Sequence, residues 1–192
     1  MDTAAKLFAA DGYARTTLAK VAAAAGVSAE TVQGQGPKAA LLIAALEHVA
    51  FGVTGEKEVL NLDVGRELVA IDDYEAAVDF FVAAHVDVHE RTARLALALF
   101  GGAGADPELE RYLDDLIANI SLQTRRILEI FGDRGWVRED VPFDEIVETA
   151  AVLCSVDTYL RVTHRDGWSA DAYRTWCRRM LVESVFVAPQ VH

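Results

Sequence analysis

Apolar residues recur at helical spacing along almost the whole chain of 192 residues. Alanine, leucine and valine dominate these segments, there are four prolines, and alternating runs of β-branched residues are scarce. Apolar positions three and four residues apart indicate amphipathic helices, whereas strict alternation would indicate half-buried strands. The pattern therefore predicts an all-α fold.

Glycines and prolines divide this pattern into helices and connections. Either Thr16 or Thr17 can cap the second helix, and the region from Gly52 to Asp73 reads as a loop with a short helix. Gly101 to Gly104 is interpreted as a helix terminator rather than a phosphate-binding loop, since it follows a helix and no Walker lysine accompanies it. The predicted helices cover about residues 3–10, 17–24, 28–33, 38–51, 74–90, 91–100, 107–132, 143–165 and 169–187.

Residues 17–32 combine a helix, a glycine turn and a second helix. Gly26 permits the left-handed backbone of a tight turn, and Ser28 can cap the helix that follows. Val27 and Val32 are expected to anchor this second helix against the first. The segment predicts a helix-turn-helix, whose second helix enters the major groove of DNA. The alternative is an alanine-rich helical hairpin inside an ordinary bundle.

The charge distribution permits DNA binding by the N-terminal segment. The chain carries a formal net charge of -12, which by itself disfavours nucleic acid. Residues 1–50, however, contain four cations and four carboxylates, so they are neutral and the acidic excess lies in the remainder. A neutral head can approach DNA while an acidic body is repelled.

Several cellular settings are disfavoured by the sequence. No apolar run approaches the roughly 20 residues that a membrane span needs, and no secretory signal pattern is present. Cys154 and Cys177 are too few for a disulfide framework and have no metal-ligand spacing. The sequence therefore predicts a cytoplasmic protein that is not inserted in a membrane.

Several motifs occur in register over about residues 3–46. They are AAKLFAADGYARTTL at 4–18, Val21-Ala22, AGVS at 25–28, Thr31-Val32 and KAALL at 38–42. Together they resemble the N-terminal domain of the TetR family of transcriptional regulators, and the C-terminal stretch 167–176 (GWSADAYRTW) is similar to the last helix of many members.

This resemblance implies an N-terminal three-helix helix-turn-helix domain over 1–46 and a helical ligand-binding and dimerisation domain over 47–192. It further implies a homodimer in which the two final helices of each chain form a four-helix bundle. A ligand in each body would shift the helix at 38–51 and change the spacing of the two reading heads.

The resemblance also assigns roles in DNA binding. Thr17 would cap the second helix and contact a phosphate, and Lys38 would contact another phosphate. Gln33 suits bidentate reading of adenine, worth ~1–3 kcal/mol. The residues expected to face bases or the DNA backbone are Ser28, Ala29, Glu30, Thr31 and Gln33.

Apolar and aromatic residues of the body suggest an effector pocket between helices. The alternative for these residues is simple core. His85 and His89 lie four residues apart on one helical face, but no third ligand is evident, so neither a metal nor a cofactor is predicted. The predicted pocket residues are Phe81, His85, Leu97, Phe100, Trp136 and Tyr159.

The last two predicted helices carry more apolar residues than a peripheral helix needs, which indicates a dimer interface. The alternative is burial against the body of the same chain. The predicted interface residues are Val147, Ala151, Cys154, Tyr173, Trp176, Cys177, Met180 and Leu181.

Together these features predict a ligand-responsive transcriptional regulator: a repressor that a small apolar or amphipathic effector releases from its DNA operator. No catalytic constellation is present, so no enzyme activity is predicted. The alternative is a small-molecule-binding or interaction protein of the same fold with a degenerate head. It is motivated by Gln33 and Gly36, which stand where the family usually has tyrosine and phenylalanine, and by the lack of a basic arm before residue 3.

Overall fold

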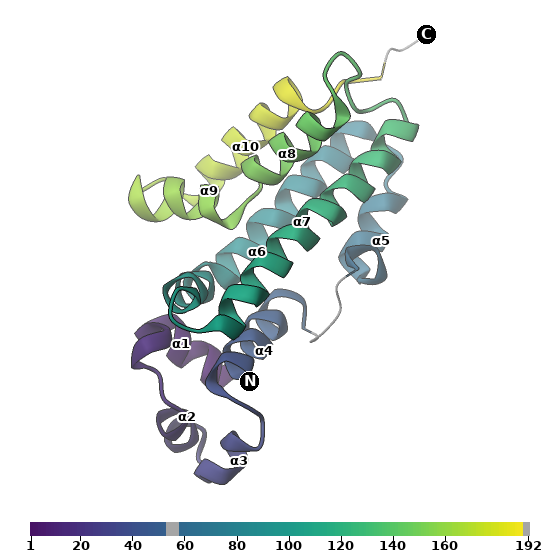
Figure 1. Cartoon of the computed structure of the whole chain (residues 1–192). Helices are drawn as coiled ribbons and strands as arrows, with labels where there is room; N and C mark the ends of the chain where they lie inside the picture. Colours follow the sequence, from purple (N-terminus) through teal and green to yellow (C-terminus); the bar gives the residue numbers. More distant parts are fainter. Residues whose placement is uncertain (53–57, 190–192) are drawn as a thin grey trace. The chain divides into compact units, whose positions relative to one another are not determined.

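The computed structural model describes residues 1–52 and 58–189, and its regular structure is helical. Among these residues a single antiparallel bridge, Val137 with Phe186, is the only β pairing. None of the described helices combines the length and hydropathy needed to span a lipid bilayer. The all-α prediction is confirmed. In chain order the elements are α1 (Asp2–Arg15), α2 (Leu18–Ala25), α3 (Ala29–Gln33), α4 (Lys38–Phe51), the 3-10 turn η1 (Val59–Asn61), α5 (Asp63–Ala70), α6 (Tyr74–Ala103), α7 (Pro107–Asp133), α8 (Phe143–Leu153), α9 (Val156–Leu160), the π-helical turn η2 (Arg161–Arg165) and α10 (Ala170–Ser184) (Figure 1).

Three helix predictions differ from the structure. The helix expected over about 3–10 continues as α1 to Arg15, with a kink at Gly12 instead of an end. The segments 74–90 and 91–100 form the single helix α6, because no glycine or proline interrupts the chain between them. The helix expected over 143–165 is instead broken after Leu153, where the Ser155 hydroxyl accepts a hydrogen bond from the Thr158 amide at 3.1 Å and starts α9. The loop expected after Gly52 contains η1 and α5, and its residues 53–57 lie outside the described residues.

The chain packs as two compact units. The first combines Met1–Gly55 with Arg91–Ile117, and the second combines Glu56–Glu90 with Ala118–His192. By packing, therefore, the N-terminal helices share a unit with the end of α6 and the start of α7. The division by function into 1–46 and 47–192 stays a prediction.

Each unit has its own apolar core. In the first, Phe8 of α1 and Leu42 of α4 are fully buried with Leu99 of α6 and Leu109 of α7. This core supports the helices that carry the predicted reading head.

In the second unit Phe81, Phe131 and Tyr173 are fully buried. The ring centroids of Phe131 and Phe186 lie 6.0 Å apart, within the range of favourable aromatic pairs. After α10, Val187 donates its amide to the Trp136 carbonyl at 2.9 Å and so ties the segment that follows this helix to the one before α8.

Gly102 is required by a close approach inside the first unit. A Cβ at this position would lie 2.6 Å from Cδ1 of Leu109 and 2.8 Å from the Tyr13 ring, whereas a Cβ on Gly101 would meet nothing within 4 Å. The glycine run ends α6 only at its last member, since the helix continues through Ala103. The predicted role as terminator is therefore wrong for Gly101 and Gly102.

We predict that Gly102→Ala destabilises the protein by ~1–3 kcal/mol, because the added methyl group overpacks the core. The matched control is Gly101→Ala, which should be neutral or stabilising by up to ~1 kcal/mol through helix propensity. Urea unfolding of both variants measures the difference. Equal stabilities for the two alanine variants would contradict the assignment.

Candidate nucleic-acid interface and effector region

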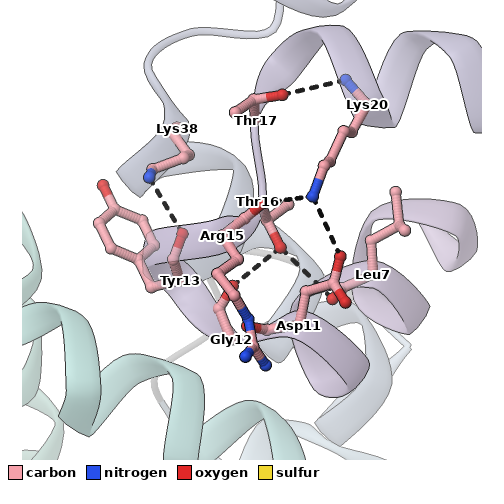
Figure 2. Close-up of polar contacts among 9 residues, drawn as sticks. All are labelled: Leu7, Asp11, Gly12, Tyr13, Arg15, Thr16, Thr17, Lys20 and Lys38. Carbon is pink, nitrogen blue, oxygen red and sulfur yellow. Dashed lines mark hydrogen bonds and ion pairs between the residues drawn. The ribbon is translucent and has the colours of Figure 1, made fainter.

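Two neighbouring threonines fix the corner between α1 and α2 (Figure 2). Gly12 has φ 74° and interrupts α1. Thr16 is fully buried, and its hydroxyl donates to the carbonyl oxygens of Gly12 at 2.8 Å and Leu7 at 3.3 Å. Thr17 is exposed and accepts a hydrogen bond from the Lys20 amide at 3.2 Å. Of the two candidate caps, Thr17 is therefore the cap of α2, and Thr16 secures the corner.

Both lysines of this corner point back onto α1 (Figure 2). Lys20 Nζ donates to the Arg15 carbonyl at 2.8 Å and lies 3.6 Å from the Asp11 carboxylate. Lys38 Nζ donates to the Tyr13 carbonyl at 3.0 Å and sits 3.9 Å from the centroid of the same tyrosine ring. Lys38, for which a phosphate contact was predicted, is thus engaged within the head.

Tyr13 also joins the head to the turn between α6 and α7. Its hydroxyl donates to the Asp106 carboxylate at 2.5 Å, across 93 residues of sequence. Burial and this carboxylate raise the pKa of Tyr13 above its ordinary value, and the donated hydrogen bond lowers the pKa of Asp106. The link was not predicted, because no local pattern relates residues so far apart in sequence.

The turn and α3 match the predicted helix-turn-helix. Gly26 adopts the left-handed conformation with φ 66°, and the Ser28 hydroxyl caps α3 by accepting from the Thr31 amide at 3.1 Å. Val32 is buried, as expected of an anchor, but Val27 is 44% exposed. The anchoring role predicted for Val27 is wrong, because the left-handed turn directs this side chain to solvent.

All the remaining predicted contact residues on this segment face solvent. The Ser28 and Thr31 hydroxyls pair with each other at 2.9 Å on this exposed face, while Val32 holds α3 against the head. Helix α3 is five residues long and is followed by Gly34 and by Gly36, whose φ is 112°. The exposed residues are Ser28, Ala29, Glu30, Thr31 and Gln33.

The predicted pocket residues are distributed over both units. Phe81, His85, Trp136 and Tyr159 belong to the second unit, whereas Leu97 and Phe100 belong to the first. Leu97 is 49% exposed.

Within the second unit Phe81 and His85 pack with ring centroids 4.5 Å apart, and His89 packs on Tyr159 at 5.4 Å. The centroids of His85 and His89 are 6.4 Å apart. Phe81, His85, His89 and Tyr159 therefore form a continuous row of rings, which we name the aromatic row. Trp136 lies outside this row, against Tyr74 and Phe131.

Hydrogen bonds fix the proton positions on the two histidines. His85 Nδ1 donates to the Phe81 carbonyl at 2.8 Å, and His89 Nε2 donates to the Cys154 carbonyl at 2.7 Å. A carbonyl only accepts, so in the neutral rings His85 Nε2 and His89 Nδ1 are acceptors. Burial lowers the pKa of His85, and it lowers the pKa of His89 from 6.5 to about 4. Both imidazoles are therefore neutral at pH 7.

A metal site would need at least a third ligand beside His85 and His89. Across residues 1–52 and 58–189, no three histidine, cysteine, aspartate or glutamate side chains gather closely enough to hold a metal ion.

The predicted interface residues divide by burial. Ala151, Trp176 and Met180 are half-buried, and Val152 next to them is 53% exposed. The others are buried inside their own chain, against neighbouring helices of the second unit; these are Val147, Cys154, Tyr173, Cys177 and Leu181.

A capped, exposed helix after a glycine turn, on a small helical head joined to a helical bundle, defines a helix-turn-helix protein. Residues 1–33 match the family described as bacterial regulatory proteins, tetR family. Over these residues the chain therefore matches the TetR family, and over almost its whole length it has the fold of solved TetR-family transcriptional regulators.

Three solved structures illustrate this likeness. A transcriptional regulator from Saccharomonospora viridis in complex with choline has a TM-score of 0.74 at 18% identity, covering 97% of this chain and 95% of that one. PfmR, a TetR family regulator from Thermus thermophilus, has a TM-score of 0.67 at 22% identity, covering 94% and 95%. The repressor FadR from Thermus thermophilus, in complex with lauroyl-CoA, has a TM-score of 0.61 at 25% identity, covering 100% and 95%. No curated protein sequence matches the chain.

We predict that stability falls by roughly 2 kcal/mol between pH 7 and pH 5 through His89 alone. Its folded pKa of about 4 lies below the unfolded value of 6.5. The unfolded chain therefore binds the proton first as the pH drops through this window. In His89→Gln the slope of unfolding free energy against pH should flatten more than in the control variant His164→Gln, which removes an exposed imidazole. Urea unfolding at several pH values measures these slopes, and an unchanged slope in His89→Gln would refute the assignment.

Proposed function

We propose that this protein is a transcriptional repressor that binds operator DNA as a homodimer and is released by a small apolar or amphipathic effector. The observation that carries the proposal is α3. Its polar face is exposed from Ser28 to Gln33, while Val32 anchors it to the head. The family match over residues 1–33 supports the same reading.

The proposed DNA contacts follow from this exposure. The Gln33 amide offers the donor and acceptor pair that reads adenine, and Ser28, Glu30 and Thr31 lie on the same segment. Thr17, exposed at the start of α2, is the better candidate for a phosphate contact. Lys38 would have to leave Tyr13 before it could reach a phosphate.

We place effector recognition at the aromatic row. Phe81, His89 and Tyr159 of the row are buried, so the row offers an apolar interior, and the neutral His85 and His89 offer acceptor nitrogens. This chemistry favours an apolar molecule that carries an uncharged hydrogen-bond donor. Solved structures of similar fold were obtained with choline and with lauroyl-CoA. Mass spectrometry of material that co-purifies with the native protein would identify such a molecule.

Helices α8 and α10 are proposed as the dimer interface. A groove of about 400 Å³ lies along α8, and the exposed Val152 lines it together with Glu145, Glu148, Thr149 and Leu153. The half-buried Ala151, Trp176 and Met180 would join the contact, while the buried members of the predicted set would support these helices from within.

We predict that Gln33→Ala weakens binding to a selected operator by roughly 5- to 150-fold, the equivalent of 1–3 kcal/mol. The matched control is Gln35→Ala, since this glutamine is also exposed but follows the end of α3. Operator selection from random DNA, followed by fluorescence anisotropy, provides the measurement. Equal losses in both variants would contradict base reading by Gln33.

The shortness of α3 favours a second candidate function. Helix α3 has only five residues and ends at two nearby glycines, which suits a ligand-binding protein whose head no longer reads DNA. The operator selection separates the candidates. Recovery of no preferred sequence, even at low salt, would reject the repressor and leave the ligand-binding protein.

We predict that Val152→Glu raises the dimer dissociation constant about tenfold or more, because it buries a carboxylate in an apolar contact. The matched control is Ile117→Glu, at an aliphatic residue of α7 that is 56% exposed. Sedimentation equilibrium measures both constants. A dimer weakened by Ile117→Glu and not by Val152→Glu would place the interface elsewhere.

A further inference from the structure

The only two cysteines of the sequence meet inside the second unit. Cys154 follows the last residue of α8, and Cys177 lies in α10. Their sulfur atoms are 3.9 Å apart, although 23 residues separate them in sequence. Both are free thiols, and the residues are 5% and 1% exposed.

The geometry brings these sulfurs close to bonding distance. A disulfide bond is about 2.05 Å long, so the two atoms have to close a gap of roughly 2 Å. Cys154 stands at the break between α8 and α9, where its φ of -91° and ψ of 8° already leave the helix. Side-chain rotation and a small shift at this break can supply the movement, because no helix continues rigidly through Cys154.

The polar surroundings distinguish the two thiols. Cys177 contacts the Leu153 carbonyl through its sulfur at 3.7 Å, and the Tyr173 hydroxyl donates to the same carbonyl at 2.8 Å. Hydrogen bonding from Cys154, with Tyr173 acting in the same direction, lowers the pKa of Cys177. The contact with Cys177 and burial hold the pKa of Cys154 well above its usual range. Cys177 is therefore the more readily ionised sulfur.

We propose that Cys154 and Cys177 form a reversible intrachain disulfide, with a small neutral peroxide as oxidant. The Cys177 thiolate attacks one peroxide oxygen, the O–O bond breaks, and hydroxide leaves and takes up a proton, so Cys177 becomes a sulfenic acid. The sulfur of Cys154 then attacks that of Cys177, the S–O bond breaks, and a second water leaves with the Cys154 proton. Two thiols lose two electrons to one hydrogen peroxide, which becomes two waters.

The burial of both cysteines restricts which oxidants can reach their sulfur atoms. Hydrogen peroxide is uncharged and about as small as water. The groove on α8 reaches Leu153, the residue directly before Cys154. Bulky or charged oxidants would be excluded by the burial of both residues. A dithiol reductant reverses the modification by exchange once the break opens.

The test uses the full reduced protein. Hydrogen peroxide is added under native conditions, free thiols are blocked with N-ethylmaleimide, and tryptic peptides are analysed without reduction. The expected product links peptide 139–161 to peptide 175–178, is two hydrogen atoms lighter than their sum, and disappears with dithiothreitol. The native protein should form it about tenfold or more faster than the same protein in urea, because the fold holds the sulfurs together.

The single variants test the order of the reaction. Cys154→Ser should accumulate a sulfenic acid at Cys177 that a dimedone probe captures, whereas Cys177→Ser should give far less capture at Cys154. The peptide assay on wild-type protein needs neither variant to fold, and it does not depend on operator binding. Absence of the linked peptide, its appearance only in urea, or recovery of sulfinic acids or intermolecular links alone would overturn the proposal.

Discussion

Tyr13 lies against Gly102 of α6 and donates its hydroxyl hydrogen to Asp106 in the turn before α7. The Lys38 ammonium covers its ring and binds its carbonyl. Since glycine has no Cβ, the ring can reach the helix backbone, and α1, α4 and the α6–α7 turn are held on one residue. Helices α2 and α3 follow α1 and precede α4 in the chain. The position of the exposed reading segment therefore depends on the contacts that Tyr13 makes. A displacement of the last turn of α6 would act on the head through Tyr13.

The sequence predicted those features of the head that depend on residues no more than four positions apart. Gly26 and Ser28 signal a turn and a cap directly, and the structure contains both. The phosphate contact of Lys38 was implied by the family resemblance. A resemblance identifies the matching position in the sequence but not which side chains surround it in this protein. The Lys38 side chain lies on Tyr13, 25 residues away, and no spacing rule relates the two. Contact between distant segments depends on how helices pack, which periodicity does not encode.

The break between α8 and α9 shows the same limit in the second unit. The apolar period runs unbroken through 143–165, so periodicity predicted one helix. The Ser155 and Thr158 hydroxyls both donate to the Val152 carbonyl. They compete there with the backbone amide that would bind this carbonyl in a continuous helix, and this competition ends α8. The freed Leu153 and Cys154 carbonyls then accept from the buried Tyr173 and His89 side chains. A buried donor without a partner is costly, so the break satisfies polar groups that a continuous helix would leave unpaired.

Electrostatics constrain how such a head could hold DNA. Residues 1–50 are neutral, so the remaining residues carry the entire charge of -12. Lys20 and Lys38 also point toward their own head, which leaves few cations to displace counterions, and affinity would change only weakly with salt. One head would then bind loosely. Two heads on a dimer raise each other's effective concentration at paired half-sites. Under the proposed function, affinity would therefore depend on the spacing of the heads, and a small shift passed through Tyr13 would suffice for release.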